Sequence, residues 1–476
     1  MSKEEAAKTG EVVETLKNLW SPMDLDRDLY FHLPLSPRSP GFCLSPLWNF
    51  HEDNYQEFTG DIHVTSTTNV LPQSPGETLL FESLAGNHET LKQSPQQCLT
   101  DRITQALAYI KKSTDRQVLA QVWVPVKMGT QYVLTTSDQP FLLSLDCNGL
   151  AQYRLVSSMY MFSIDAINVD LGLPGRVFRT KLPEWSPNVQ YYSIAEYPQL
   201  IHAIRCNVRG TLALPLFVSG GSCIGVLELI MTSQKINYAP EIDLLYRALE
   251  AVELKSSETF KLPHTHVADE NDQIELVEIL ELLTIVSETY KLPLAQTWIP
   301  SSNRHVVPCG GSLRANTSFE GRLMKQVCLS TSNLAFYVVD AHMWGFREAS
   351  TEHSLLEGQG VVGRAYLSLK SCFCKDVNQF CKIEYPLVNY ARLFGLHSCF
   401  AVPICDTQTW KNIYILEFFL PTTLANFRYL QKLLNFLSAT ISQSSPNLHM
   451  ISHKECSKDG AIELINLHVD MKPAES

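Results

Sequence analysis

The stretch LEGQGVVGRAYLSLKSCFCKDV (356–377) decides the fold, because an earlier stretch, LGLPGRVFRTKLPEWSPNVQYYS (171–193), keeps in step with it. Gly175-Arg176 recurs as Gly363-Arg364, 188 positions later. The same spacing relates Glu196-Tyr197-Pro198 to Glu384-Tyr385-Pro386 and Pro215 to Pro403, and Leu227-Glu228 returns after 189 positions as Leu416-Glu417. Unrelated segments do not hold register over such a length, so the chain contains one fold twice.

Helices and strands are predicted in the same order in both copies. DRITQALAYIKKS (101–113) has the apolar spacing of a helix, and VLAQVWVPV (118–126) reads as a buried strand. The first copy ends with the strand GSCIGVLELIM (221–231) and a helix from Ala239, with Pro240 in its first turn. In the second copy the matching pieces are a helix carrying Ile274, Val277, Leu280, Ile285 and Val286, the strands LAQTWIP (294–300) and NIYILEFFL (412–420), and a helix carrying Leu430, Leu433, Leu434 and Leu437.

Composition changes along the chain predict five segments. Residues 1–97 contain repeated Ser-Pro pairs without a sustained apolar period, which is typical of a disordered region. Residues 98–260 form the first domain and 273–442 the second, joined by a linker at 261–272. The polar segment 443–476 is predicted to be disordered. Helices that bracket antiparallel strands predict an α+β fold in each domain.

Bulk composition argues against several classes of protein. The acidic start is unlike a secretory signal, and the apolar stretches are shorter than the ~18 residues that span a bilayer, so we expect no membrane association. A net charge of −11 without a basic run argues against a nucleic-acid surface. The 13 cysteines are expected to be reduced thiols. Cys372, Cys374 and Cys381 lack the second pair of a zinc site, and Cys372 and Cys374 alternate as on one strand face, so no metal is expected.

Long blocks of the chain resemble a known family. Residues 356–377 are similar to the GAF-domain signature, and residues 171–193, 225–243, 338–350 and 381–402 are similar to the N-terminal region of plant NIN-like proteins, which are RWP-RK transcription factors. The resemblance implies two tandem GAF-like domains, each an antiparallel sheet with helices packed on it. It also implies nitrate-responsive regulation of transcription, in the nucleus and cytoplasm, with no enzymatic activity and no cofactor.

The resemblance also implies a nitrate site in the second GAF-like domain. Nitrate is a planar, weakly hydrated monoanion, so its pocket needs N–H or O–H donors within apolar walls. An indole, an imidazole and a phenol supply such donors, and a bound anion should raise the pKa of the histidine. The 188-residue offset puts Val156 opposite Trp344 and Asp165 opposite His353. The carboxylate of Asp165 would repel an anion. The residues that match the family's pocket are Trp344, His353, Leu355 and Tyr385.

The chain departs from the family after the second domain. The basic RWP-RK region and the C-terminal interaction domain have no counterpart before residue 476, so we expect no direct sequence-specific DNA binding. Output would then pass through full-length NIN-like proteins or other regulators. The alternatives are a non-sensing dimerisation or interaction protein, such as a truncated, dominant-negative relative, and a GAF receptor for another small molecule.

Two enzyme-like patterns have simpler explanations. Gly358, Gly360 and Gly363 match a dinucleotide-binding fingerprint, but no strand directly precedes them and Asp376 follows too soon, so a tight GAF turn is the better interpretation. No Ser-His-Asp or Cys-His arrangement has the local context of a hydrolase.

Overall fold

The computed structural model describes residues 95–113, 117–129, 131–144, 148–164, 171–218, 221–256, 270–300, 305–308, 323–407, 412–421, 427–451 and 462–465. The predicted disordered region 1–97 lies outside the described residues, apart from the start of a helix at Pro95. The predicted linker 261–272 also lies outside them, except where a helix begins at Glu270. Both sheets described below belong to one compact unit, Glu89–Ser476.

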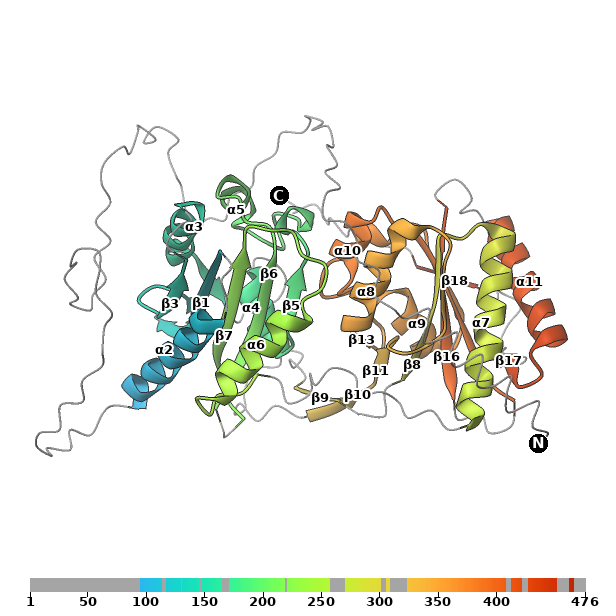
Figure 1. Cartoon of the computed structure of the whole chain (residues 1–476), viewed down its shortest axis with the longest axis horizontal. Helices are drawn as coiled ribbons and strands as arrows, with labels where there is room; N and C mark the ends of the chain where they lie inside the picture. Colours follow the sequence, from blue (N-terminus) through green and yellow to red (C-terminus); the bar gives the residue numbers. More distant parts are fainter. Residues whose placement is uncertain are drawn as a thin grey trace, which may run out of the picture. The chain divides into compact units, whose positions relative to one another are not determined.

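The first module (95–256) is a single antiparallel sheet with helices on both faces. Its strands follow the order β4-β2-β1-β7-β6-β5, and β3 pairs with β1. Figure 1 shows two helices, α2 and α6, lying across one face of this sheet. Helices α3, α4 and α5 pack on the other face. The elements are α2 (Pro95–Ser113), β1 (Val118–Met128), β2 (Gln131–Thr135), β3 (Phe141–Leu143), α3 (Asn148–Met159), β4 (Met161–Ser163), α4 (Gly172–Thr180), β5 (Glu184–Ser186), η2 (Val189–Tyr191), α5 (Leu200–Arg205), β6 (Thr211–Phe217), β7 (Cys223–Met231) and α6 (Ala239–Glu250).

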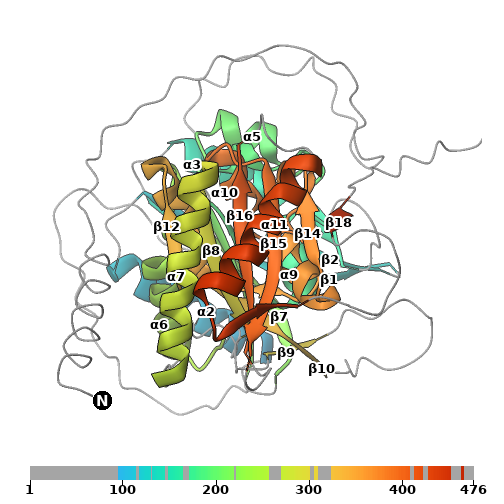
Figure 2. The same ribbon diagram turned by 90° about the vertical axis from the view of Figure 1, so that its right-hand side faces the viewer.

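The second module (270–465) repeats this architecture and adds strands to it. Its sheet follows the order β13-β11-β8-β16-β15-β14-β18, while β12 pairs with β8 and β17 with β15. Figure 2 shows α7 and α11 side by side on one face, and α8, α9 and α10 pack on the other. The elements are α7 (Glu270–Tyr290), β8 (Leu294–Pro300), β9 (His305–Pro308), β10 (Leu323–Gln326), β11 (Cys328–Ser330), β12 (Phe336–Val338), η3 (Ala341–Met343), α8 (Trp344–Glu352), β13 (Leu355–Leu356), α9 (Gly360–Ser368), β14 (Ser371–Cys374), η4 (Val377–Gln379), α10 (Val388–Leu393), β15 (Ser398–Asp406), β16 (Ile413–Leu420), α11 (Phe427–Ser444), β17 (Leu448–Met450) and β18 (Ile462–Ile465). The predicted α+β fold with tandem GAF-like domains is confirmed.

The central strands are apolar on both faces because helices cover both sides of each sheet. In β1, Val118 and Val122 contact the α2 side, whereas Leu119 and Trp123 face α3 and α4. Successive side chains of a strand point to opposite faces, so covering both faces requires a nearly continuous apolar run. This explains why the predicted strands 118–126, 221–231, 294–300 and 412–420 are all found.

The helix predictions are confirmed with one correction, the buried face of α7. The structure buries Ile279, Leu282, Leu283 and Val286, and it leaves Ile274 and Ile285 exposed. The sequence EILELLTIV carries apolar residues around more than one face, so spacing alone does not select the stripe that meets the sheet.

The predicted disorder of 443–476 is wrong for two short strands. β17 pairs with β15, and β18 adds to β14 in parallel. Ile462 and Ile465 are buried against the sheet. Strands of three and four residues are too short to show a period, and their pairing depends on an edge that a distant part of the chain supplies.

The glycine turn before α9 is confirmed as a structural feature. Gly358 and Gly360 have φ values of +87° and +58°, where a side chain is strained. A Cβ at Gly363 would lie 2.4 Å from the Leu356 carbonyl oxygen. Cys372 and Cys374 also lie in β14 and belong to one core cluster, as their alternation predicts.

Candidate functional site

A buried polar network fixes a helix to the sheet in the first module. Gln121 and Glu228 are register partners on β1 and β7, and the Gln121 amide donates to the Glu228 carboxylate at 3.0 Å. The Trp123 indole donates to the same oxygen at 2.7 Å. Arg154, on α3, donates to the Gln121 amide oxygen at 3.2 Å and to the Thr136 hydroxyl at 2.8 Å. These bonds hold α3 against the strands.

The second module repeats the network residue for residue. Gln296 and Trp298 donate to the Glu417 carboxylate at 2.8 and 2.7 Å. Arg347, on α8, donates to the Gln296 amide oxygen at 3.1 Å and to the Thr331 carbonyl oxygen at 2.8 Å. Burial raises the pKa of Glu417 and lowers the pKa of Arg347 to about 9. α8, which begins at one predicted site residue and ends before another, is therefore anchored to the sheet.

The two networks correct the predicted correspondence between the modules. α3 and α8 are equivalent because Arg154 and Arg347 make the same contacts, and these arginines are 193 positions apart, not 188. The segment from Arg154 to Arg176 spans 22 positions and the segment from Arg347 to Arg364 spans 17, so the offset measured further along the chain does not hold here. Asp165 itself lies outside the described residues. The corrected register pairs Ala151 with Trp344 and Tyr160 with His353, in place of Val156 and Asp165.

Trp344 begins α8 and is 41% exposed. Its ring meets Phe336 of β12 edge to face, with ring centroids 5.6 Å apart. His353 follows the last residue of the same helix. At 1.5 Å of rise per residue, the two backbones are ~13 Å apart. The structure therefore places Trp344 and His353 at opposite ends of α8 and does not bring their backbones together.

His353 is 5% exposed and lies where the two modules meet. Its ring is 4.3 Å from the Trp185 ring of the first module and 5.3 Å from the Tyr390 ring of α10. Nδ1 lies 2.8 Å from the Ala349 carbonyl oxygen, which only accepts, so Nδ1 carries the proton. Burial first, and then the charge of Lys382, lower the pKa of His353 to about 3. The imidazole is therefore neutral at pH 7, and Nε2 is its acceptor.

Leu355 and Tyr385 lie in the core of the second module. Leu355 begins β13 and is fully buried. Tyr385, in the turn before α10, is 1% exposed, and its hydroxyl has no hydrogen-bond partner within the described part of the chain. Burial first, and then the nearby Glu417 and Cys399, raise the pKa of this phenol. Within the same described residues, no hydrogen bond links the Tyr385 hydroxyl to His353 or Trp344.

The equivalent tyrosine of the first module is satisfied. Tyr197 corresponds to Tyr385, and its hydroxyl lies 2.5 Å from the Tyr153 hydroxyl. Tyr153 directly precedes the network arginine of its module. In the second module Phe346 has that position, and it carries no hydroxyl. This one difference leaves the Tyr385 donor without the partner that its counterpart has.

The end of α8 also contacts the first module through Glu352. The Glu352 carboxylate accepts the backbone N–H of Tyr238 at 3.0 Å and that of Ala239 at 3.3 Å. These groups open α6, and the side chain of Tyr238 provides no cap. Glu352 thus caps a helix of the other module, next to His353. Burial raises the pKa of Glu352 to about 7.

A second contact between the modules centres on Lys382. Its backbone N–H donates to the Glu196 carboxylate at 2.6 Å, and the Asn389 amide donates to the Ser186 hydroxyl at 2.9 Å. The repeat around Tyr385 is visible in the sequence, whereas the roles of Lys382 and Glu352 are not. Their partners lie 186 and 114 positions away in the other module, and no local pattern marks such contacts.

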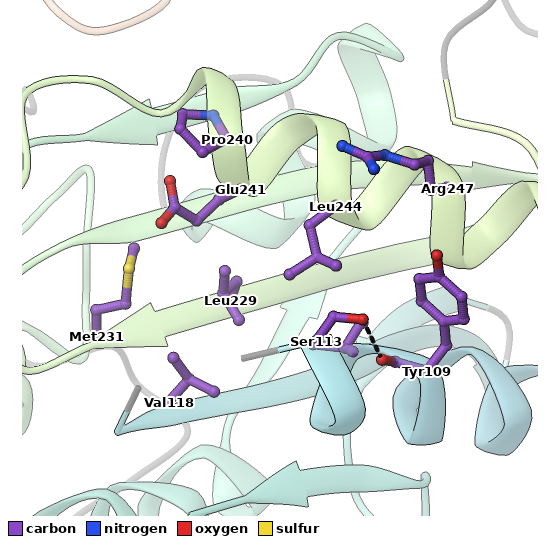
Figure 3. Close-up of a pocket in the computed structure, with 10 residues that line it drawn as sticks. Tyr109, Ser113, Val118, Leu229, Met231, Pro240, Glu241, Leu244 and Arg247 are labelled. Atoms are coloured by element: carbon purple, nitrogen blue, oxygen red, sulfur yellow. Dashed lines mark hydrogen bonds between the residues drawn. The ribbon is translucent and has the colours of Figure 1, made fainter. Parts of the chain in front are cut away.

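A hollow of about 320 Å³ opens elsewhere, on the outer face of the first module. Figure 3 shows it between α2 and α6, with Tyr109, Leu229 and Leu244 among the residues that line it. Arg247 stands at one end and Glu241 at the other. None of the four predicted nitrate residues lines this hollow, so it is a separate feature.

The described residues contain neither a metal-binding cluster nor a membrane-spanning helix. Within them, no group of three or more His, Cys, Asp or Glu side chains is arranged to hold a metal ion. No described helix combines the length and the apolar character needed to cross a membrane.

Comparison with known proteins identifies close relatives. Protein NLP6 of Arabidopsis thaliana is 49% identical over 90% of this chain and 53% of its own length. Protein NLP7 of Arabidopsis thaliana is 52% identical over 79% of the chain and 40% of its own length, and Protein NLP3 of Oryza sativa subsp. japonica is 50% identical over 83% and 44%. The chain thus spans about half the length of these relatives. A solved GAF-domain structure overlaps 33% of the chain and 84% of its own, at 14% identity and a TM-score of 0.21.

The family model for the NLP protein GAF domain matches the chain twice, at residues 90–260 and 266–449. These two matches include all of the first sheet, the second sheet apart from β18 and the end of β17, and all four predicted site residues. The chain therefore belongs to the NLP family and carries the family's GAF domain in duplicate.

Proposed function

We propose that this protein is a non-enzymatic, nitrate-responsive regulator of transcription, and that its second module binds nitrate. Membership of the NLP family supports a regulatory role. Nitrate sensing follows the resemblance of Trp344, His353, Leu355 and Tyr385 to the family's pocket. The observation that carries the proposal is the buried Tyr385 hydroxyl, which has no partner among the described residues.

The unpartnered hydroxyl favours a ligand that accepts a hydrogen bond. Leaving a buried donor unsatisfied costs ~1–3 kcal/mol, and a bond to an anion is stronger than one between neutral groups. A nitrate oxygen at Tyr385 would satisfy the donor, with Leu355 as apolar wall. The first module differs, because the Tyr153 and Tyr197 hydroxyls share a hydrogen bond and each therefore has a partner. We therefore assign sensing to the second module alone.

His353 links nitrate binding to proton uptake. In the neutral imidazole Nε2 presents a lone pair, which repels an anion, so His353 contributes a donor only as imidazolium. Its ligand-free pKa of about 3 is far below neutrality. A bound anion raises that pKa, because opposite charge favours the protonated form. Nitrate affinity should therefore rise as the pH falls through the raised pKa of the nitrate-bound state toward the ligand-free value of about 3.

The contacts at the end of α8 supply a route from ligand to output. Glu352 caps α6 of the first module directly before His353, so a ligand that moves His353 also moves this cap. A ligand shifts such an equilibrium only if it binds one arrangement more tightly. We propose that the altered module surface acts on partners, either full-length NIN-like proteins or other regulators, in the nucleus and cytoplasm.

The test is the nitrate-dependent rise in melting temperature of the full chain, which reports ligand binding to the native state. The wild type and the matched control Tyr197→Phe should both be stabilised by nitrate, whereas Tyr385→Phe should lose most of the shift. A wild-type melting temperature that does not respond to nitrate, or responds equally in Tyr385→Phe, would rule the proposal out.

A further inference from the structure

Lys382 is a buried lysine with too few partners. It is 3% exposed and lies in the turn between η4 and α10. Its ammonium donates to the Pro386 carbonyl oxygen at 2.5 Å, and within the described residues it makes no other hydrogen bond. An ammonium has three donors, so two remain available. Burying a charge in this state is costly unless a counter-charge compensates it.

The carboxylates near Lys382 already have partners. Arg176 pairs with Glu184 at 2.6 Å, and Arg392 lies 3.6 Å from Glu196. These four groups are the charges that act most strongly on Lys382. Three cations and two carboxylates leave one positive charge without a counterpart. A single bound monoanion would neutralise the cluster, whereas a dianion would leave it negative.

Lys382 and the predicted nitrate residue His353 both lie near the ring of Tyr390. Its Nζ is 5.9 Å from the centre of the Tyr390 ring, and the His353 ring is 5.3 Å from the same ring. Trp185 of the first module covers His353 from another side. The uncompensated charge and the imidazole therefore flank one aromatic ring at the junction of the modules.

We propose that Lys382 provides the positive charge that compensates the anion bound by the second module, next to His353. This inference rests on the proposed nitrate site and names a positioning residue for it. It makes the site selective for monoanions over dianions such as sulfate. It also places the charge of the site on a residue that contacts Glu196 of the first module, so the anion strengthens the junction.

The experiment is a calorimetric titration of the full chain with nitrate and with sulfate, at pH 7 and pH 9. Lys382→Met should weaken nitrate binding by about tenfold or more, the effect of removing a close charge in a partly desolvated site. Lys181→Met is the matched control, because the Lys181 ammonium also donates to a backbone carbonyl and lies 3.7 Å from a ring centre. It should leave nitrate binding unchanged.

The pH profile separates a role for the charge from a role in packing. Burial lowers the pKa of Lys382 to about 8, and anion binding raises it again. Wild-type affinity should therefore fall between pH 7 and 9, and Lys382→Met should not show this fall. The charged groups that act on Lys382 are Glu184, Glu196, Arg176 and Arg392.

Each outcome decides a different claim. If the wild type binds nitrate and folded Lys382→Met binds equally well, Lys382 is not the compensating charge. If Lys382→Met does not fold, a wild-type affinity that stays constant from pH 7 to 9, or sulfate binding as tight as nitrate binding, overturns the inference. If the wild type binds no nitrate at all, the proposed function itself fails.

Discussion

Phe346→Tyr should weaken nitrate binding by about tenfold to a hundredfold without harming the fold. Phe346 occupies the place that Tyr153 has in the first module, where the Tyr153 and Tyr197 hydroxyls lie 2.5 Å apart. A tyrosine at 346 would place a hydroxyl beside Tyr385, whose own hydroxyl has no partner among the described residues. The substitution therefore rebuilds the first module's pair and gives the Tyr385 hydroxyl a neutral partner that competes with nitrate.

The two expected effects have opposite signs. A new buried hydrogen bond contributes ~1 kcal/mol, so the free energy of unfolding without nitrate should stay level or rise by about that amount. Losing a hydrogen bond to an anion costs ~1.5–3 kcal/mol, which weakens nitrate binding by about tenfold to a hundredfold. Phe346 packs 5.1 Å from Phe419, ring centre to ring centre, so any overpacking would appear as lower stability.

Urea unfolding measures the first effect and equilibrium nitrate binding the second. The matched control, Tyr153→Phe, orphans Tyr197 in the first module. It should lower the free energy of unfolding by ~1–3 kcal/mol and leave nitrate affinity unchanged. If Phe346→Tyr binds nitrate as well as the wild type, the Tyr385 hydroxyl is not a nitrate donor. If Tyr153→Phe weakens nitrate binding as much as Phe346→Tyr does, binding is not confined to the second module.

Two further predictions concern buried charges. Glu352→Gln should flatten the pH dependence of stability. The folded-state pKa of Glu352 is about 7, above its ordinary value of 4.5, so the native state binds a proton more tightly than the unfolded state. The wild type therefore loses stability as the pH rises from about 5 to 7. Urea unfolding across that range checks this, with Glu348→Gln as the control; an unchanged slope would contradict it. Arg347→Ala should lower the free energy of unfolding by ~3–5 kcal/mol, because the buried Glu417 loses its neighbouring cation. The same change at the exposed Arg247 should cost less than ~1 kcal/mol, and equal losses at both positions would show that burial is not the cause.

The fold was predictable because the motifs that mark it occur twice and the apolar patterns that mark its strands and helices lie within short segments. The recurrence of Gly175-Arg176 as Gly363-Arg364 fixed the duplication, and continuous apolar runs fixed the central strands. Apolar spacing identified α2, α6 and α11. It did not select the buried face of α7, which carries apolar residues on several sides, and it did not reveal β18, whose pairing partner is β14.

The candidate site was predictable only in part. The resemblance supplied four residues, but a single offset between the copies misaligned α3 with α8. The network around Glu417 joins the three elements β8, β16 and α8, so its members are far apart in the sequence. Lys382 and Glu352 are candidate functional residues because they contact the other module. Interactions of this kind depend on tertiary packing, which no local spacing encodes.

Whether the second module alone binds nitrate is tested most directly by the stoichiometry of nitrate bound to the full chain, measured by equilibrium dialysis with isotopically labelled nitrate. We predict one nitrate ion per chain, which is retained in Tyr197→Phe and lost in Tyr385→Phe. Two equivalent ions per chain, or one ion that survives Tyr385→Phe and disappears in Tyr197→Phe, would show that the second module is not the nitrate-binding unit.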